Sequence, residues 1–336
     1  MDRPKRIVQF GIVLAVASLV LSAAVTERAR AAGDKSTRLS DLGLEFDRVM
    51  MGPVADRAEK LGGLAASLDA LMKDGLEKDR KAAAYFLSGE IRFALGDFDE
   101  AAESYKDAFE ADKKGAFADD AEFAEILAIE AQGQDDEAEK SWHKWEKHHE
   151  GSPLVPEVCL ARTWNALRRN SLREAAAHLS RIDSDYSYMK ADPRVCLARA
   201  AVAYKQGDAD GSLAALADTQ GAPESYLRGL AYQAKGEMLK AAAQFQAVVE
   251  RYPQTSLRDH AMIAKADVFL ESGAYRTAAE EFEMVAAQAR NRGVIAQAEL
   301  RRAACVFLDN DLAAGTQLLR VPTKPRARSS CSARSC

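Results

Sequence analysis

The sequence has little of what marks several classes of protein. Aromatic residues make up 7% of its 336 residues, and 20 glycines and 9 prolines are too few for a collagen-like or low-complexity chain. It contains neither a glycine-rich phosphate loop nor the serine motif of the nucleophile elbow. A net charge of −5 gives no overall attraction to nucleic acid. The sequence therefore favours a non-enzymatic protein with no cofactor and no nucleic-acid partner.

Metal-ligating residues are also sparse. The nearest zinc-like pattern begins with His149, but its fifth residue is Pro153, so it does not place two histidines on one helix face. His143, His148 and His149 form a local group with two interpretations, an adventitious metal site or a solvated helix end. The sequence favours the helix end, and we expect neither a metal site nor a catalytic residue.

The five cysteines give little scope for disulfides. Cys159 and Cys196 are 37 residues apart, which places them at equivalent positions of a repeat described below. Equivalent positions on stacked helices lie roughly 10 Å apart, beyond the reach of a disulfide. We therefore expect both to be core residues, as we do for Cys305. Cys331 and Cys336 are left as a candidate pair, and an odd total leaves at least one free thiol.

The N-terminus has the pattern of an export signal. Arg3, Lys5 and Arg6 precede an apolar run over residues 7–25, and the sequence Ala29-Arg30-Ala31 follows before Ala32, with small residues at positions 29 and 31. We expect cleavage after a signal peptide of residues 1–31. Because 19 apolar residues approach the length that spans a bilayer, an uncleaved anchor over residues 7–25 is the alternative. Either way the protein is predicted to be exported, to be periplasmic or envelope-associated, and to touch a membrane only through this segment.

The rest of the chain is helical in composition and repetitive. From residue 39 onward alanine, leucine, glutamate, lysine and glutamine recur with helical spacing, which predicts an all-α protein. Gly or Asn recurs at steps of 37, 37, 37, 29, 37 and 37 residues. These two residues readily end a helix in the left-handed conformation. The seven marker residues are Gly96, Gly133, Asn170, Gly207, Gly236, Gly273 and Asn310.

Two further kinds of residue recur at fixed distances after the markers. Five residues after each marker stands a small residue, and nine residues after it a large apolar one, so the two share a helix face. Each unit is therefore a first helix, a tight turn and a second helix. Neither helix buries itself alone, so the units must stack into a solenoid. The large residues are Tyr105, Trp142, Leu179, Leu216, Phe245, Phe282 and Leu319.

This pattern resembles the tetratricopeptide repeat (TPR) family. The resemblance rests on the run Gly96-Asp97-Phe98 with Ala101, Tyr105 and Ala108, and on Gly229, Tyr232, Gly236, Ala241, Phe245, Val248 and Pro253. The units are 37 residues long where the family norm is 34. Longer loops between units resemble exported bacterial members, such as the periplasmic protein of the Tol-Pal system and outer-membrane assembly lipoproteins. The resemblance implies a right-handed α-α superhelix over residues 80–319 with six to seven repeats.

Other segments have separate predictions. Residues 32–79 are expected to form helices that cap the first repeat. The 29-residue step predicts a short second helix after Gly207 and a change of superhelical curvature. Residues 320–336 carry five cationic and no acidic side chains, so they are either a basic tail for an anionic polymer or lipid, or a disordered or frame-shifted end. Since the N-terminus is also basic, the repeats themselves are markedly acidic.

The resemblance also implies a binding surface, because members of the family usually bind partners in the concave groove lined by their first helices. Residues ten and six before each marker share one face of the first helix, and most are apolar. One interpretation is a groove for a partner segment, with Trp164 as an aromatic anchor, and the other is a wider inter-helix core. The predicted groove residues are Phe86, Phe123, Leu127, Leu160, Trp164, Leu197, Tyr226 and Leu230.

Together these features predict an interaction scaffold or assembly factor of the bacterial cell envelope, whose partners are other proteins. An envelope protein that binds a cell-wall polymer or glycan, and an accessory relative of repeat-bearing periplasmic peptidases, are the two alternatives. Fold alone does not choose among them, since one fold serves many functions.

Overall fold

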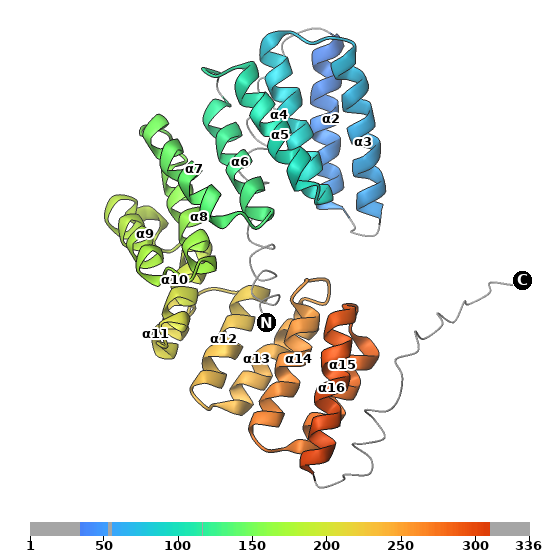
Figure 1. The fold of residues 1–336 in the computed structure, drawn as a ribbon, viewed down its shortest axis with the longest axis vertical. Helices are drawn as coiled ribbons and strands as arrows, with labels where there is room; N and C mark the ends of the chain where they lie inside the picture. The colour runs from blue at the N-terminus through green and yellow to red at the C-terminus, as the bar shows by residue number, and fades with distance from the viewer. Residues whose placement is uncertain (1–33, 53–55, 116, 310–336) are drawn as a thin grey trace, which may run out of the picture. The chain divides into compact units, whose positions relative to one another are not determined.

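The structure is a computed structural model that describes residues 34–52, 56–115 and 117–309. The predicted export signal, the basic tail, Asn310 and the cysteine pair near the C-terminus lie outside these ranges. The chain divides into two compact units between Thr219 and Gln220, and each is described by itself. In the described ranges every regular element is helical, as predicted (Figure 1).

Unit 1 contains ten α-helices in the described ranges and a short 3-10 turn, Ser187–Met189. Its helices run antiparallel to their neighbours, so that consecutive helices lie side by side (Figure 1). They are α2 (Asp34–Met51), α3 (Arg57–Lys73), α4 (Lys78–Leu95), α5 (Phe98–Ala111), α6 (Ala118–Ala131), α7 (Asp135–His148), α8 (Val155–Arg168), α9 (Leu172–Asp185), α10 (Pro193–Lys205) and α11 (Ala209–Ala215).

Unit 2 contains five α-helices in its described part, each packed on the next in the chain. They are α12 (Ala222–Ala234), α13 (Met238–Arg251), α14 (Arg258–Glu271), α15 (Tyr275–Gln288) and α16 (Arg292–Leu308). The even-numbered helices from α4 to α16 are the first helices of the repeats. The odd-numbered ones from α5 to α15 are the second helices.

The marker residues end the first helices as the sequence predicted. Gly96 and Gly273, for example, have φ angles of 90° and 78°, and the other three marker glycines in the described ranges also lie in the left-handed region. Asn170, with φ of 61°, is the one described residue other than glycine with a positive φ. Since this conformation reverses the chain at the end of a helix, it sets the start of each second helix within two residues.

The two helices of a repeat approach closely at a small residue. Gly89 of α4 faces the ring of Tyr105, and a Cβ atom added to Gly89 would lie 2.5 Å from that ring. Gly229 of α12 faces Phe245 of α13 at the same 2.5 Å. Both aromatic side chains are buried, with at most 1% of their surface exposed. The absence of a Cβ atom at these two positions is therefore what admits the ring of the second helix.

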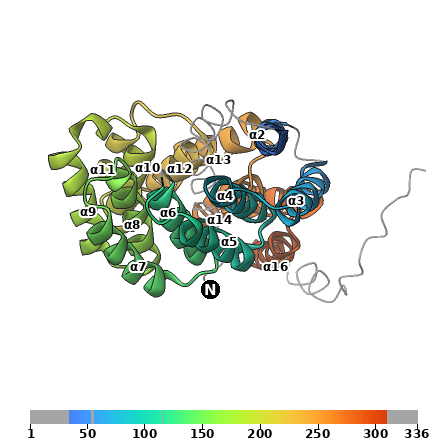
Figure 2. The same cartoon turned by 90° about the horizontal axis from the view of Figure 1, so that it is seen from above.

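Helices α2 and α3 pack beside the first repeat. Their apolar side chains, including Phe46, Leu61 and Leu68, share one core with Leu87 and Ile91 of α4. Figure 2 looks nearly along these helices and shows α2, α3 and α4 grouped together. They occupy the segment for which the sequence predicted capping helices.

The 29-residue step corresponds to the short helix α11. It has 7 residues where α5, α7 and α9 each have 14, as the early turn residues after Gly207 predicted. The boundary between the two units follows directly at Thr219. The predicted change of curvature concerns how the two units are placed, and it stays a prediction.

Candidate interaction surface

Most of the predicted groove residues are buried. Six of the eight expose between 2% and 7% of their surface: Phe86, Phe123, Leu127, Leu160, Trp164 and Leu197. Tyr226 and Leu230, both on α12 of unit 2, are partly exposed. The four buried residues that stand ten before a marker contribute to the core between helices, as the second interpretation proposed. A binding role for the eight residues stays a prediction. Tyr226 and Leu230 are the two whose side chains are partly accessible to solvent.

Trp164 differs from the anchor that the sequence suggested. It exposes 6% of its surface, and its indole N–H has no hydrogen-bond acceptor among the described residues. A buried donor without an acceptor destabilises a folded protein by about 1–3 kcal/mol. The other two tryptophans do have acceptors: Trp142 donates to Glu130 at 2.8 Å, and Trp145 donates to the backbone oxygen of Asp119 at 3.0 Å.

In the first repeat a buried carboxyl group contacts Tyr105, the large residue of the second helix. The Tyr105 hydroxyl donates a hydrogen bond of 2.6 Å to Glu90, which exposes 9% of its surface. Burial raises the pKa of Glu90 to about 7, the hydrogen bond from Tyr105 opposes this shift, and the nearby carboxylates of Asp47 and Asp120 add to it. The sequence alone does not reveal this site, because Glu90 stands six residues before its marker, a position that is otherwise mostly apolar in the repeats.

Asp120 has a similarly perturbed environment. Burial raises its pKa to about 6, and the adjacent Asp119 carboxylate contributes. Burial also raises the pKa of Asp47 on α2 above its ordinary value. Helices α2, α4 and α6 thus each carry a carboxyl group whose pKa is raised by burial, which disfavours the charged form.

Salt bridges join successive repeats of unit 1. Arg168 of α8 contacts Glu130 of α6 at 2.5 Å and Asp135 of α7 at 2.5 Å. Arg194 of α10 donates two hydrogen bonds of 2.9 Å to the carboxylate of Glu157 on α8. A two-point contact between guanidinium and carboxylate fixes orientation as well as distance. These pairs therefore hold neighbouring first helices in register.

On α12 of unit 2 the corresponding helix face is more open. Tyr226 and Leu230 lie four residues apart on α12, with Gln233 one turn further along. The Gln233 amide donates a hydrogen bond of 2.7 Å to Glu271 of α14. Two partly exposed apolar side chains beside a polar pair form a surface suited to a peptide or helix, because it offers both apolar area and hydrogen-bonding groups.

The histidines and cysteines do not form a site in the described part of the chain. His149 contacts Glu122 at 2.5 Å through its Nε2 atom, and no group of three or more metal-ligating side chains occurs in the described ranges. Cys159, Cys196 and Cys305 are free thiols, so the prediction that Cys159 and Cys196 are not bridged is confirmed. Cys159 and Cys305 are buried as predicted, whereas Cys196 is partly exposed.

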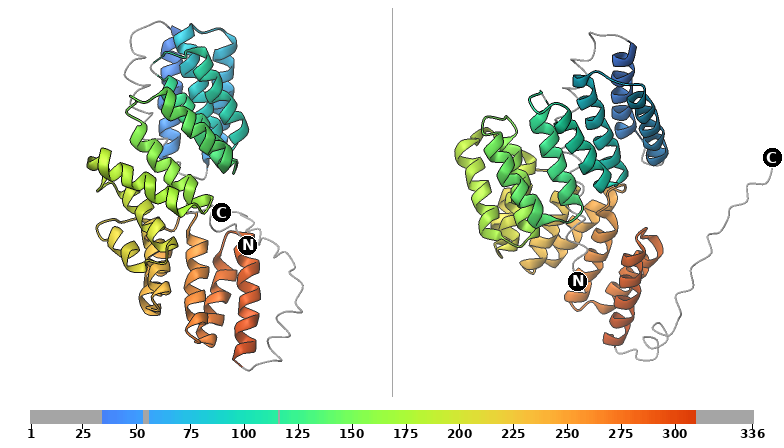
Figure 3. Two further views of the ribbon diagram at one scale, coloured as in Figure 1. Left: turned by 60° about the vertical axis from the view of Figure 1, so that its left-hand side comes forward. Right: turned by 45° about the horizontal axis from the view of Figure 1, so that its top comes forward.

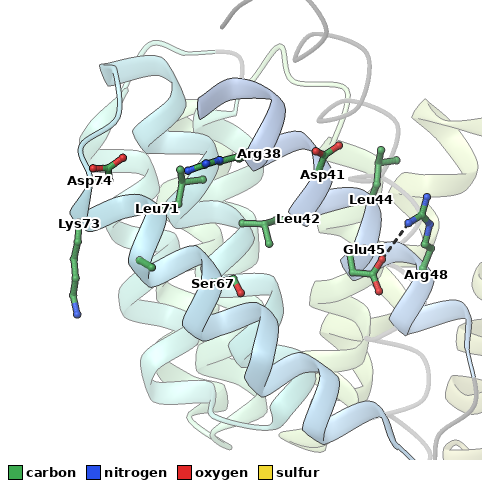
Figure 4. A pocket seen from close by; sticks show the side chains of 11 residues that line it. Arg38, Asp41, Leu42, Leu44, Glu45, Arg48, Ser67, Leu71, Lys73 and Asp74 are labelled. Atoms are coloured by element: carbon green, nitrogen blue, oxygen red, sulfur yellow. Dashed lines mark hydrogen bonds and ion pairs between the residues drawn. The ribbon is translucent and has the colours of Figure 1, made fainter. Parts of the chain in front are cut away.

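A pocket of about 840 Å³ lies between α2 and α3 (Figure 4). Its rim mixes the basic Arg38 and Arg48 with the acidic Asp41 and Glu45, and Leu42 forms part of its wall. Glu45 and Arg48 are paired at 3.1 Å. The mixed rim gives the pocket no preference for one sign of charge, and none of the predicted groove residues lines it.

No helix in the described ranges combines the length and the apolar character needed to cross a bilayer.

Comparison with solved structures identifies the fold. A crystal structure of a tetratricopeptide repeat protein from Parabacteroides merdae aligns with 79% of this chain and 99% of its own, at 15% identity and a TM-score of 0.58. The TPR domain of P58(IPK) aligns with 83% of this chain and 82% of its own at 15% identity, with a TM-score of 0.25. A chain of the structure of Naa15/Naa10 bound to HypK-THB aligns with 93% of this chain and 60% of its own at 13% identity, with a TM-score of 0.27. At TM-scores this low, the last two structures do not superimpose on this chain as a whole.

Comparison of sequences agrees at one repeat. Residues 82–114, which cover most of α4 and all of α5, match a family model described as a tetratricopeptide repeat. No curated protein matches the chain. The matched repeat, the same turn geometry at the following markers and the shared fold show that this chain contains a tetratricopeptide repeat and has the fold of tetratricopeptide repeat proteins.

Proposed function

We propose that this protein is a non-enzymatic scaffold or assembly factor that binds other proteins of the bacterial cell envelope. Its fold supports the first part, since tetratricopeptide repeats are used to bind proteins. The N-terminal pattern of basic, apolar and small residues supports export. The acidic composition of the repeats favours partners with a basic or apolar surface.

One observation carries the choice of binding surface. Among the eight predicted groove residues, Tyr226 and Leu230 are the two whose side chains retain accessible surface. They stand on one face of α12, and an aromatic residue beside an aliphatic one is a common composition for the centre of an interface. We assign the partner site to this face of unit 2.

Chemical crosslinking in an envelope extract tests the assignment. The full chain is compared with a double variant, Tyr226→Ala with Leu230→Ala, and with a control, Leu239→Ala, which removes a side chain that is 83% exposed on the second helix α13. The expected result is that specific protein partners are lost from the double variant and kept by the control. Circular dichroism of each variant shows that the helices remain formed.

Two results contradict the proposal. Retention of every partner by the double variant removes this face of α12 as the site. Co-sedimentation with peptidoglycan in the absence of any protein partner favours a glycan-binding protein instead. Sequencing of the mature N-terminus, with fractionation of cells, tests export separately: a mature chain that starts at Met1 contradicts cleavage, and recovery of the protein from the cytosol contradicts export.

A further inference from the structure

The buried carboxyl group of Glu90 has no cationic partner among the described residues. It exposes 9% of its surface on α4, and Tyr105 of α5 donates a hydrogen bond of 2.6 Å to its Oε1 atom. The charged groups that act on it are two carboxylates, Asp47 of α2 and Asp120 of α6, and none of them lies on α3. An ionised carboxylate in such surroundings is costly, because neither water nor a positive charge compensates it. The packed helices therefore favour the neutral form of Glu90.

The next repeat also buries a carboxyl group, but it supplies a cation. Glu130 of α6 exposes 6% of its surface and accepts a hydrogen bond of 2.8 Å from the indole N–H of Trp142. It also contacts the guanidinium group of Arg168 at 2.5 Å. Even with this cation, burial raises the pKa of Glu130. Glu90 lacks the cation, so the loss of its proton must disturb the helices around it more strongly.

Helix α2 is the neighbour of Glu90 that can move most easily. Helices α5 and α6 are each packed between two others, α5 between α4 and α6, and α6 between α5 and α7. The main neighbours of α2 among the described helices are α3 and α4, and Figure 3 shows the blue α2 and α3 beside α4. Asp47 lies on α2 between Phe46 and Val49, two residues of the core that α2 shares with α4. Movement of α2 away from α4 therefore separates Asp47 from Glu90 and gives water access to this side of α4.

We infer that α2 is a proton-controlled cover of the first repeat, which packs on α4 when Glu90 is protonated and opens from α4 when Glu90 ionises. Opening uncovers part of the apolar core that includes Leu87 and Ile91 of α4. Because burial of these side chains favours the closed state, the proton shifts a population between closed and open forms and does not melt the helices. This inference does not depend on the proposed partner site on α12.

The direction of the switch follows from proton linkage. Burial raises the pKa of Glu90 from 4.5 to about 7 in the closed state, whereas contact with water restores its ordinary pKa in the open state. The closed state thus binds the proton more tightly. It has its full advantage below pH 4.5, and it loses that advantage as the pH rises to about 7. The open fraction is expected to rise by about 10- to 100-fold between pH 5 and pH 8.

Hydrogen–deuterium exchange of the full chain, followed by mass spectrometry, tests the inference. Peptides from residues 34–51 are compared at pH 5, 6, 7 and 8, with exchange rates corrected for the intrinsic effect of pH. In the wild type, the protection of α2 is expected to fall by about 10- to 100-fold over this range. In Glu90→Gln it is expected to fall by no more than about threefold, because the titrating group is gone. Glu103→Gln, at an exposed position of α5, is the matched control and is expected to behave as the wild type.

Asp47→Asn tests whether α2 is the helix that moves. It removes the charge on α2 that acts on Glu90, so the fall in protection between pH 5 and pH 8 is expected to be smaller than in the wild type. An unchanged fall would mean that ionised Glu90 does not displace α2. Wild-type protection of α2 that stays constant with pH, or a fall that Glu90→Gln retains, would also overturn the inference. So would a fall spread evenly over all helices of unit 1, although a pH-dependent stability of the whole unit would then still hold.

Discussion

The buried carboxyl group of Glu90 makes the stability of unit 1 depend on pH. In the folded protein its pKa is raised from 4.5 to about 7, chiefly because burial disfavours the charged form. The folded state therefore holds this proton more tightly than the unfolded chain does. As pH rises from about 4.5 to about 7, the folded state must either keep the proton or bury a charge, so its stability falls, and it levels off above that range.

The size of the effect follows from the shift in pKa. Each unit corresponds to about 1.36 kcal/mol, so Glu90 destabilises the folded state by about 3 kcal/mol at pH 8 relative to pH 4. Glu90→Gln removes the titration and keeps an oxygen to accept the hydrogen bond from Tyr105. We expect this variant to be more stable than the wild type by about 3 kcal/mol at pH 8, with the difference vanishing near pH 4.

Tryptophan fluorescence is a suitable assay because Trp142, Trp145 and Trp164, which are all the tryptophans of the chain, lie in unit 1. Urea unfolding is followed at several pH values between 4 and 8 for the wild type and for Glu90→Gln. Other carboxyl groups titrate in both proteins, so the difference between them isolates Glu90. The exposed Glu103→Gln is the control. A difference that does not change with pH would show that Glu90 is not the buried acid described above.

Three further predictions concern packing and turns. Gly229→Ala is expected to lose about 1–3 kcal/mol in thermal unfolding because its Cβ atom would strike an aromatic ring, whereas Gly62→Ala, with open space around it, is expected to gain about 0.5–1 kcal/mol. Asn170→Ala should lose about 1 kcal/mol and Asn170→Gly almost none, since φ is 61° there; equal stabilities would argue against a left-handed turn. Arg168→Met should lose about 3–5 kcal/mol in urea unfolding, with partial recovery on adding Glu130→Gln; no recovery would mean that the buried charge is not the cause.

The repeat structure was predictable because its signals are local. Gly96 and Asn170 were identified from sequence as turn residues, and both adopt the left-handed conformation that ends a first helix. Gly229 and Phe245 were both among the residues that carried the resemblance in the sequence, and in the structure Gly229 faces the ring of Phe245. Backbone conformation at a turn and the spacing of residues on a helix face depend on near neighbours in the chain, so one sequence is enough to reveal them.

The surface was less predictable because it depends on what covers each helix. Leu160 and Leu300 each stand ten residues before a marker, yet 2% of the first and 63% of the second is exposed. Trp164 was an attractive anchor in the sequence, but its side chain lies inside the protein. Nothing local distinguishes these positions, since exposure is set by the presence or absence of a neighbouring helix.

The sequence by itself therefore determined the all-α class, the repeat length, the turn residues and the short helix after Gly207. The tertiary structure alone decided that Glu90 is a buried acid held by Tyr105, that unit 2 keeps Tyr226 and Leu230 partly accessible, and that Leu300 of α16 is exposed. The physical reason is the same in each case. Helix and turn formation follow from short-range backbone preferences, whereas burial, pKa and accessible surface arise only when distant helices are packed together.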